Sequence, residues 1–296
     1  MKFGAIFPTP EIGSDPAAIR DWAQAAEALG YARIITYDHV LGAVHEKREP
    51  KLTGPYTERD AFHEPFVLFG FLAGVTRAIE LMTGILILPQ RQTALVAKQA
   101  AEVDILSGGR LILGIGSGWN TVEYESLGVP WARRGRRLDE QVEVLRRLWS
   151  EPVIDYRGEF HRIDRAGILP LPKRAIPIWY GGFSEPAFAR AAVSGDGFLL
   201  GGSGVPFRKH LERLRELLAQ QGRDPRAFGS DCQLDYSAGP ELWHSEIEAW
   251  KAAGIDCISL RAMDTASTFV GAKPMGYAGP RAYIEALERF KREVGF

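Results

Sequence analysis

Short apolar segments of strand length alternate along the chain with longer segments in which apolar residues recur at helical spacing. The first pair is Lys2–Phe7, which predicts a strand, and the segment opened by Pro16, whose apolar residues share one helical face. The other segments that predict strands are Arg33–Tyr37, Ile79–Leu88, Arg110–Ile115, Ile176–Tyr180, Gly197–Leu200, Ser230–Tyr236 and Asp256–Leu260. The other segments that predict helices are Pro65–Thr76, Thr93–Leu106, Arg136–Trp149, Phe207–Gln220, Glu241–Ala253 and Arg281–Val294.

Regular alternation of strands and helices implies parallel strands joined by right-handed crossovers, as in an α/β barrel or an open doubly wound sheet. About eight strand–helix pairs in 296 residues favour the closed (β/α)8 TIM barrel. Two irregular stretches interrupt the pattern, Leu41–His63 after the second strand and Glu151–Ala175 between the fourth helix and the fifth strand. We interpret both as insertions into one barrel domain spanning residues 1–296, and expect the first to form part of a lid or a dimer contact.

Composition and charge argue against several classes of protein. The chain is 46% hydrophobic and 25% charged, as in an ordinary globular protein. Its net charge of −1 provides no overall basic field to attract nucleic acid. The longest apolar run, Phe66–Val75, is too short to cross a bilayer, and the amino terminus shows no signal-peptide pattern, so we expect a cytoplasmic protein. Cys232 and Cys257 show no CxxC spacing and no neighbouring histidine, which argues against a metal site or a disulfide framework.

In a barrel of this type the active site lies at the carboxyl ends of the strands. After the second predicted strand, Asp38 and His39 combine a carboxylate with the side chain that titrates closest to neutral pH. Such groups can transfer a proton or donate a hydrogen bond to a reacting centre. The alternative is a capped strand end with a histidine that serves the structure alone.

Glycines mark the third and fourth strands. Gly84 interrupts a run of aliphatic residues, which indicates a bulge, a close ligand approach or the accommodation of a bulky neighbour. The segment Gly114–Gly118 is similar to a dinucleotide fingerprint, but its third glycine comes one residue early, and Trp119 and Asn120 precede any helix. Its small residues beside Trp119 suit a flat ring system. The alternative is a tight turn with Trp119 packed in the core.

Two further features suit an anionic group. The segment Gly181–Ser184 lies between the fifth strand and a helix that Ser184 is expected to cap, so bare backbone N–H groups could bind a phosphate. A capped turn without a ligand is the alternative. Arg133–Arg137 is the densest positive cluster of the chain, which suits an anionic cofactor tail or, alternatively, a solvated helix start.

Six segments, in order along the chain, carry a resemblance to a known family. They are Thr36–His39, Thr83–Arg91, Ala97–Arg110, Leu113–Asn120, Arg134–Gln141 and Tyr180–Gly182. Together they resemble the luciferase-like monooxygenase superfamily, in particular its branch that depends on the deazaflavin coenzyme F-420. The resemblance covers most of the chain up to about Leu200.

The resemblance implies roles for residues at the strand ends. Asp38 and His39 match an acid–His pair that faces the reactive ring carbon, and are the expected catalytic residues. Gly84–Ile85 matches a bulge, often with a non-proline cis peptide, that presses the deazaflavin into a bent shape, and Gly181–Ser184 would hold the phosphate region. The expected cofactor-binding residues are Gly84, Ile85, Ser117, Gly118, Trp119, Asn120, Gly181, Gly182, Phe183 and Ser184.

The chain departs from the family pattern in two places. Some deazaflavin dehydrogenases of the superfamily carry a tryptophan shortly after the Asp-His pair and a glutamate after the strand-four glycines. Here those places hold Leu41–Ala43 and Trp119. The departure argues against a sugar-phosphate dehydrogenase and leaves His39 as the main candidate for acid–base chemistry, since Trp119 donates no proton at neutral pH.

The sequence therefore predicts an oxidoreductase that transfers hydride between coenzyme F-420 and a small organic substrate, with His39 assisting proton transfer. A homodimer is implied by the resemblance alone. The nearest alternative is an FMNH2-dependent monooxygenase on the same barrel, with FMN as cofactor, although the basic cluster favours F-420. We also consider a non-catalytic flavin-binding protein and a metal-dependent hydrolase, the second of which is disfavoured by the lack of a His-x-His pattern after the first strand.

Overall fold

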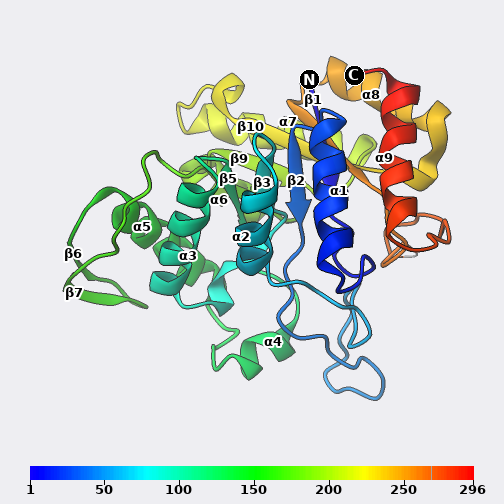
Figure 1. The fold of residues 1–296 in the computed structure, drawn as a ribbon. Helices are drawn as coiled ribbons and strands as arrows, with labels where there is room; N and C mark the ends of the chain where they lie inside the picture. Colours follow the sequence, from blue (N-terminus) through cyan, green and yellow to red (C-terminus); the bar gives the residue numbers. More distant parts are fainter. Residues whose placement is uncertain (268) are drawn as a thin grey trace.

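A closed barrel of parallel strands, surrounded by helices, forms the centre of the computed structural model, which describes residues 1–267 and 269–296 (Figure 1). The barrel strands are β1 (Lys2–Ile6), β2 (Arg33–Thr36), β3 (Glu80–Thr83), β5 (Leu111–Gly116), β8 (Ile178–Gly181), β9 (Gly197–Leu200), β10 (Gly229–Asp235) and β11 (Cys257–Arg261). The barrel is closed because β1, the first strand, pairs in parallel with the last strand, β11, and β3 pairs in parallel with β5. The prediction of a (β/α)8 TIM barrel is confirmed.

The third predicted strand, Ile79–Leu88, is divided in the structure. Strand β3 pairs with β2 and β5, and the chain then resumes as the short strand β4 (Leu86–Ile87), which pairs with β5. The peptide bond between Gly84 and Ile85 is cis, as the resemblance implies. A Cβ on Gly84 would overlap with the side chain of Ile35, so close packing also explains why a glycine stands at this position.

Helices follow the barrel strands and cover the outside of the barrel (Figure 1). They are α1 (Pro16–Ala28), α2 (Pro65–Val75), α3 (Thr93–Leu106), α5 (Arg134–Ser150), α6 (Glu185–Ser194), α7 (Val205–Gln220), α8 (Gly239–Ala252) and α9 (Pro280–Val294). The short helix α4 (Thr121–Ser126) lies instead at one end of the barrel. Short 3-10 turns are η1 (Leu88–Gln90), η2 (Pro225–Ala227) and η3 (Tyr236–Ala238). Asp15 caps α1, because its carboxylate accepts the N–H of Ala17 at 2.9 Å. Among the described residues, no helix combines the length and the apolar character that crossing a membrane requires.

The two insertions differ in structure. Residues 41–63 run through turns and loops at the same end of the barrel as α4, at the bottom of Figure 1. The second insertion contains an antiparallel hairpin of β6 (Ile154–Arg157) and β7 (Arg162–Ala166). The prediction of an irregular segment is wrong for these residues. The two strands are difficult to recognise in the sequence because they are short and only β6 alternates between buried and exposed positions. The carboxylate of Glu140 fixes the hairpin to α5 by accepting a hydrogen bond from His161 at 2.8 Å.

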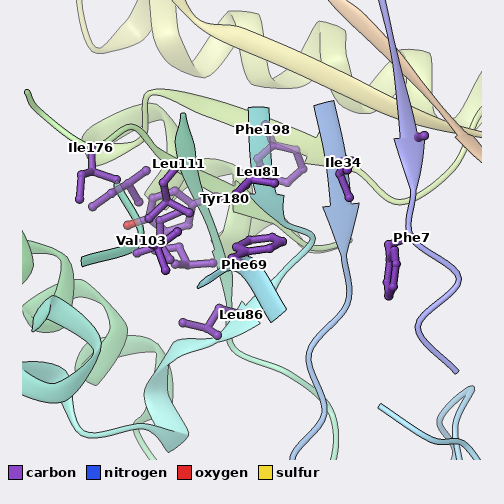
Figure 2. Close-up of a cluster of buried hydrophobic side chains, with 14 of the residues drawn as sticks. Phe7, Ile34, Phe69, Leu81, Leu86, Val103, Leu111, Ile176, Tyr180 and Phe198 are labelled. Atoms are coloured by element: carbon purple, nitrogen blue, oxygen red, sulfur yellow. The ribbon is translucent and has the colours of Figure 1, made fainter. Parts of the chain in front are cut away.

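Successive strand residues point alternately into the barrel and out toward the helices. In β2, Ile35 faces the interior while Ile34 belongs to the outer layer, part of which Figure 2 shows. That layer joins strand residues such as Leu81 to helix residues such as Phe69 and Val103. The interior is filled by Ile6, Ile35, Met82, Ile112, Trp179 and Leu199. A filled interior confines a ligand site to an end of the barrel.

Buried charges close the amino-terminal end of the barrel, here called the base. Arg33, at the start of β2, contacts Asp231 of β10 at 3.2 Å and Glu80 of β3 at 2.9 Å. Ser259 of β11 donates a hydrogen bond to Asp231 at 2.9 Å. Burial raises the pKa of Asp231, and the attraction of Arg33 opposes that rise. Ionised groups can be buried in this way only because each faces an opposite charge.

Candidate active site

A cavity of about 570 Å³ opens at the carboxyl ends of the barrel strands, here called the mouth. Its walls come from the ends of β2, β4, β5, β8, β10 and β11 and from residues 53–56 of the first insertion. The predicted site residues that line it are Asp38, His39, Gly84, Ile85, Ser117, Gly118, Trp119, Gly181, Gly182, Phe183 and Ser184. Asn120 does not line it. This side chain is buried and caps α4 by accepting the N–H of Val122 at 3.0 Å.

One wall of the cavity consists largely of bare backbone. This glycine wall is formed by Gly84, Ile85, Gly116, Gly118 and Gly181. A Cβ placed on Gly116 or on Gly181 would lie 2.7 Å from the side chain of Ile85. Gly118 has a φ of +63°, a conformation that favours glycine. Ile85 thus presents an apolar surface flanked by glycines, which suits a flat ring that lies close to backbone.

His39 lies at the cavity with one ring nitrogen fixed. Its Nδ1 is 3.0 Å from Oε2 of Glu123, whose side chain is fully buried. The second oxygen of Glu123 accepts the N–H groups of Val40 at 2.6 Å and Leu41 at 3.1 Å. Because a carboxylate only accepts hydrogen bonds, Nδ1 is the donor. In the part of the chain that the structure describes, Nε2 of His39 has no hydrogen-bond partner.

Glu123 is a residue that sequence reasoning missed. The prediction places the family glutamate directly after the strand-four glycines, where Trp119 stands, whereas Glu123 lies in the first turn of α4. Asn120 and Glu123 have the spacing of an N-cap residue and the third residue of its helix, which is a helix-start signal. That signal could have identified α4 and its acidic residue. The structure thus supplies a buried glutamate for His39, although the sequence departs from the family pattern at Trp119.

The carboxylate of Asp38 is engaged by Arg91 and not by His39. Its Oδ1 accepts a hydrogen bond from Arg91 at 2.7 Å, and its Oδ2 accepts the N–H of Ile87 at 2.9 Å. Arg91 also contacts Glu64 at 2.8 Å. Burial opposes the charge of Arg91, but the attraction of Asp38 and Glu64 raises its pKa. Asp38 therefore fixes the chain around β4 and makes no hydrogen bond to His39 within the described residues. The expected catalytic role of the two residues, which both line the cavity, stays a prediction.

Trp119 lines the cavity, so the alternative that places it in the core is wrong. Its ring centroid lies 5.5 Å from that of His39 and 6.0 Å from that of His45. A Cβ on Gly54 would overlap with the Trp119 ring, so the first insertion packs directly on this side chain. Tyr56 of the same insertion has its ring centroid 5.1 Å from that of His39. The first insertion therefore builds one side of the mouth.

The segment Gly181–Ser184 leads from β8 into α6 at the edge of the cavity. Ser184 is the N-cap residue of α6, but its side chain makes no capping hydrogen bond, so that part of the prediction is wrong. Arg134 lines the cavity as well, and its guanidinium lies 3.6 Å from the centroid of the Trp131 ring. Its buried Nε has no partner within the described residues. The cavity thus offers both backbone N–H groups at a helix start and a cation, which is the chemistry that holds a phosphate.

The rest of the basic cluster is engaged elsewhere. Arg133 and Arg136 contact Glu159 beside the hairpin. Arg137 donates a hydrogen bond to the carbonyl of Pro130 at 3.1 Å. Arg134 is the member of the cluster that lines the cavity. Arg134 is therefore the member of the cluster that remains available to an anionic cofactor tail, whereas the sequence predicted this role for the whole cluster.

Several polar residues that line the mouth lie outside the predicted site, and three of them come from the ends of barrel strands or directly after them. They are Tyr37 after β2, Gln233 in β10 and Arg261 at the end of β11. Arg261 directly follows the last predicted strand, so the rule that places active sites at carboxyl ends could have identified it. The resemblance fades before these strands and offers no motif for Gln233 or Arg261.

The cysteines and acidic residues form no metal site in the described part of the chain. No group of three or more His, Cys, Asp or Glu side chains within residues 1–267 and 269–296 is arranged to hold a metal ion. Cys232 and Cys257 are buried free thiols. Burial raises the pKa of both thiols, which keeps them protonated at neutral pH.

Comparison with known proteins identifies relatives over most of the chain. An uncharacterized protein of Mycobacterium tuberculosis is 35% identical over 207 residues, which cover 68% of this chain and 71% of that protein. An FMNH2-dependent dimethylsulfone monooxygenase of Pseudomonas fluorescens is 32% identical over 189 residues, 63% of this chain and 48% of that enzyme.

Solved structures share the fold at low sequence identity. A monooxygenase of Streptomyces bottropensis superimposes with a TM-score of 0.75 at 20% identity, covering 99% of this chain and 98% of that one. An F-420-dependent secondary alcohol dehydrogenase, in complex with an F-420–acetone adduct, gives a TM-score of 0.70 at 17% identity over 90% of this chain and 96% of that one. The family model for luciferase-like monooxygenases matches residues 1–282. The chain belongs to the luciferase-like monooxygenase family.

Proposed function

We propose that this protein is an oxidoreductase that holds coenzyme F-420 at the mouth and transfers hydride between it and a small organic substrate. The observation that carries the proposal is the glycine wall, where Ile85 and its flanking glycines leave backbone exposed to a flat ring. The cofactor supplies the carbon that gives or takes the hydride. The chain supplies binding, orientation and proton handling.

The residues of the cavity fit such a cofactor in two parts. The glycine wall would hold the ring, with Ser117 and Trp119 beside the chain that links it to the phosphate. The N–H groups of Gly181–Ser184 and the guanidinium of Arg134 would hold the phosphate. The unpartnered buried Nε of Arg134, among the described residues, supports this assignment because a buried donor without an acceptor is costly.

His39 is the residue that would hold or move a proton during the reaction. Glu123 fixes Nδ1 as a donor, so Nε2 is the nitrogen left to face a ligand. The rings of Tyr56 and Trp119 pack against His39, which restricts its rotation and excludes water from that side. A fixed imidazole with one free nitrogen suits general acid–base catalysis near neutral pH.

An FMNH2-dependent monooxygenase is the second candidate. The relatives of defined activity favour it: the dimethylsulfone enzyme of Pseudomonas fluorescens and a pyrimidine monooxygenase of Allorhizobium ampelinum, 32% identical over 175 residues. The chain spans about half the length of each of these enzymes. The reduction of the basic cluster to Arg134 also weakens the argument for a long anionic tail.

A binding titration separates the two candidates. Apoprotein is titrated with oxidised F-420 and separately with FMN, and the intrinsic fluorescence is followed because Trp119 lines the cavity. We expect micromolar or tighter binding of F-420 and much weaker binding of FMN. Preference for FMN would replace the proposal with the monooxygenase, whose oxygen-dependent turnover is then measured. Tight binding without turnover of any substrate would indicate a flavin carrier.

A further inference from the structure

The cavity has a second wall on the opposite side of the barrel from the glycine wall. This polar wall consists of Tyr37, Tyr56, Gln233 and Arg261. Gln233 and Arg261 come from β10 and β11, which lie across the barrel from β4 and β5 in the strand order. A ring on the glycine wall would therefore leave the polar wall facing the substrate.

Arg261 is held rigidly at this wall although it is almost fully buried. Its guanidinium contacts Asp235 at 2.7 Å and donates hydrogen bonds to the carbonyls of Met263, at 3.2 Å, and of Thr265. Burial opposes its charge, but Tyr37 and Asp235 raise its pKa. Arg261 therefore stays charged, and its contacts fix the positions of the residues at the end of β11 in the polar wall.

The amide of Gln233 is oriented by Tyr37. The hydroxyl of Tyr37 donates a hydrogen bond to Oε1 of Gln233 at 2.9 Å. Burial raises the pKa of Tyr37 to about 12, so this donor keeps its proton, although the nearby Arg261 acts in the other direction. Because Oε1 is occupied, the donor side of the amide, Nε2, is the side available to a ligand, and no described residue accepts its N–H groups.

The acidic side chains around the mouth are occupied by other partners. Asp235 contacts Arg261, Glu123 holds His39, and Asp38 holds Arg91. Tyr56 adds a hydroxyl that makes no hydrogen bond within the described residues, and burial raises its pKa, so it keeps its proton. Nε2 of Gln233 can only donate hydrogen bonds, whereas the hydroxyl of Tyr56 can donate or accept them. The ligand atom that contacts Gln233 must therefore be an acceptor.

We propose that the polar wall is the substrate subsite and binds an oxygen on an sp2 carbon, that of a ketone or of a carboxylate, through Nε2 of Gln233. The proposal rests on the proposed function, because the substrate lies between this wall and the cofactor ring. The remainder of the substrate packs against the apolar lining of the cavity, Leu199 and Val270 among others. Tyr56 lies between Tyr37 of this wall and His39, since its ring centroid is 6.3 Å from that of Tyr37 and 5.1 Å from that of His39.

The test uses three probes of the same size and the full-length protein, with and without F-420. Acetophenone carries a ketone oxygen, benzoate carries a carboxylate, and ethylbenzene carries no acceptor. Binding is measured by ligand-observed NMR titration on wild type and on Gln233→Leu, with Gln220→Leu as the matched control on the exposed face of α7. The dissociation constants of F-420 and FMN are measured separately on each variant.

The expected result is that acetophenone or benzoate binds wild type better than ethylbenzene does. Gln233→Leu weakens that binding about three- to tenfold, the effect of one lost hydrogen bond, without changing cofactor binding. Gln220→Leu leaves all constants unchanged. Preference for acetophenone assigns the site to ketones, and preference for benzoate assigns it to carboxylates.

The subsite is disproved if Gln233→Leu binds both oxygen probes as wild type does, or if ethylbenzene binds equally well. Should Gln233→Leu fold poorly, Tyr37→Phe takes its place: losing the hydroxyl that orients the amide should weaken binding about two- to threefold. The proposed function fails separately, when wild type does not bind F-420 more tightly than FMN, whatever the probes do.

Discussion

The two ends of the barrel are built from the same strands but use their polar groups in opposite ways. At the base, Arg33 lies between Asp231 and Glu80, and each charge faces an opposite one. At the mouth, carboxylates are also paired, but His39 and Gln233 keep donor or acceptor atoms that no described residue satisfies. The charges of the base are therefore paired without a ligand, although Oδ1 of Asp231 makes no hydrogen bond within the described residues. At the mouth, by contrast, the side chains that keep unsatisfied atoms line the cavity.

This difference separates stability from function along one barrel axis. Changes at the base should lower the free energy of unfolding and leave ligand binding by the folded molecules unchanged. Changes at the mouth should act first on ligand binding and turnover. Each variant below is paired with a control at an exposed position, so that the two kinds of effect can be told apart.

The largest expected effect is that of His39→Ala on turnover. Removing the proposed acid–base group should reduce the rate of hydride transfer about 100- to 10,000-fold, while cofactor affinity stays close to that of wild type. The measurement is stopped-flow kinetics with a substrate found by screening small carbonyl compounds. His244→Ala, on the exposed surface of α8, serves as the control. Equal rates for both variants would remove His39 from the mechanism.

Arg33→Met tests the base. Loss of this cation leaves Asp231 buried without its partner, which should lower the free energy of unfolding by about 3–5 kcal/mol at pH 7. Burial already raises the pKa of Asp231, and losing Arg33 raises it further. Because the folded state then favours the protonated carboxyl, ionisation of Asp231 at neutral pH destabilises the fold. The loss of unfolding free energy in Arg33→Met should therefore become smaller when the pH is lowered from 7 to 5 and Asp231 is protonated. Urea unfolding measures it, with exposed Arg20→Met as control. A deficit below about 1 kcal/mol would contradict the account.

Glu123→Gln changes a residue that serves both the fold and the site. The amide of the glutamine keeps one acceptor oxygen, but its N–H₂ group replaces the other oxygen that accepts hydrogen bonds from His39 or from the chain at Val40 and Leu41. The free energy of unfolding should therefore fall by about 2 kcal/mol. The rate of turnover should fall as well, since His39 loses its fixed orientation. Glu125→Gln, at an exposed position of the same helix, is the matched control for both measurements. Unchanged turnover with reduced stability would limit Glu123 to a structural role.

Glu27→Gln has the smallest expected effect and sharpens the comparison at the base. The Glu27 carboxylate accepts the N–H groups of Ala78 at 2.7 Å and of Ile79 at 2.9 Å, just before β3. Burial opposes its charge, but these hydrogen bonds lower its pKa. A lowered pKa gives stability that is present at neutral pH and lost on acidification. Glu27→Gln should cost about 1 kcal/mol at pH 7, and this deficit should shrink as the pH falls below 4.5 and through the lowered pKa of Glu27, whereas Glu293→Gln should cost nothing at any of these pH values.

The barrel could be predicted from the sequence because short apolar segments typical of buried strands alternate with segments of helical periodicity along the whole chain. Thr93–Leu106 and Gly197–Leu200 agree with the structure to the residue. The hairpin of β6 and β7 could not be predicted, since its stability comes from packing on α5 and from His161. Gly84 and the resemblance indicated a bulge between β3 and β4. The division of Ile79–Leu88 into two strands could not be predicted, because this segment is apolar along most of its length.

The lining of the cavity was largely predictable because barrel strands end there, but the pairing of its side chains was not. Asp38 and His39 are neighbours in sequence, yet Arg91 takes one and Glu123 takes the other. Such partners come from distant segments, and their distances are set by tertiary packing. The roles of the site residues, the homodimer and the cellular location stay predictions.

The most direct test of the glycine wall is a cofactor titration on a variant that fills it. Wild type, Gly116→Val at the wall and Gly74→Val on the exposed surface of α2 are compared with F-420 and with FMN. A side chain on Gly116 overlaps with the side chain of Ile85, which forms the surface of the glycine wall, so we predict that this variant loses cofactor binding. Wild type and Gly74→Val should bind with equal, micromolar or tighter affinity. Binding by Gly116→Val as tight as that of wild type would contradict the claim that the ring lies on this wall.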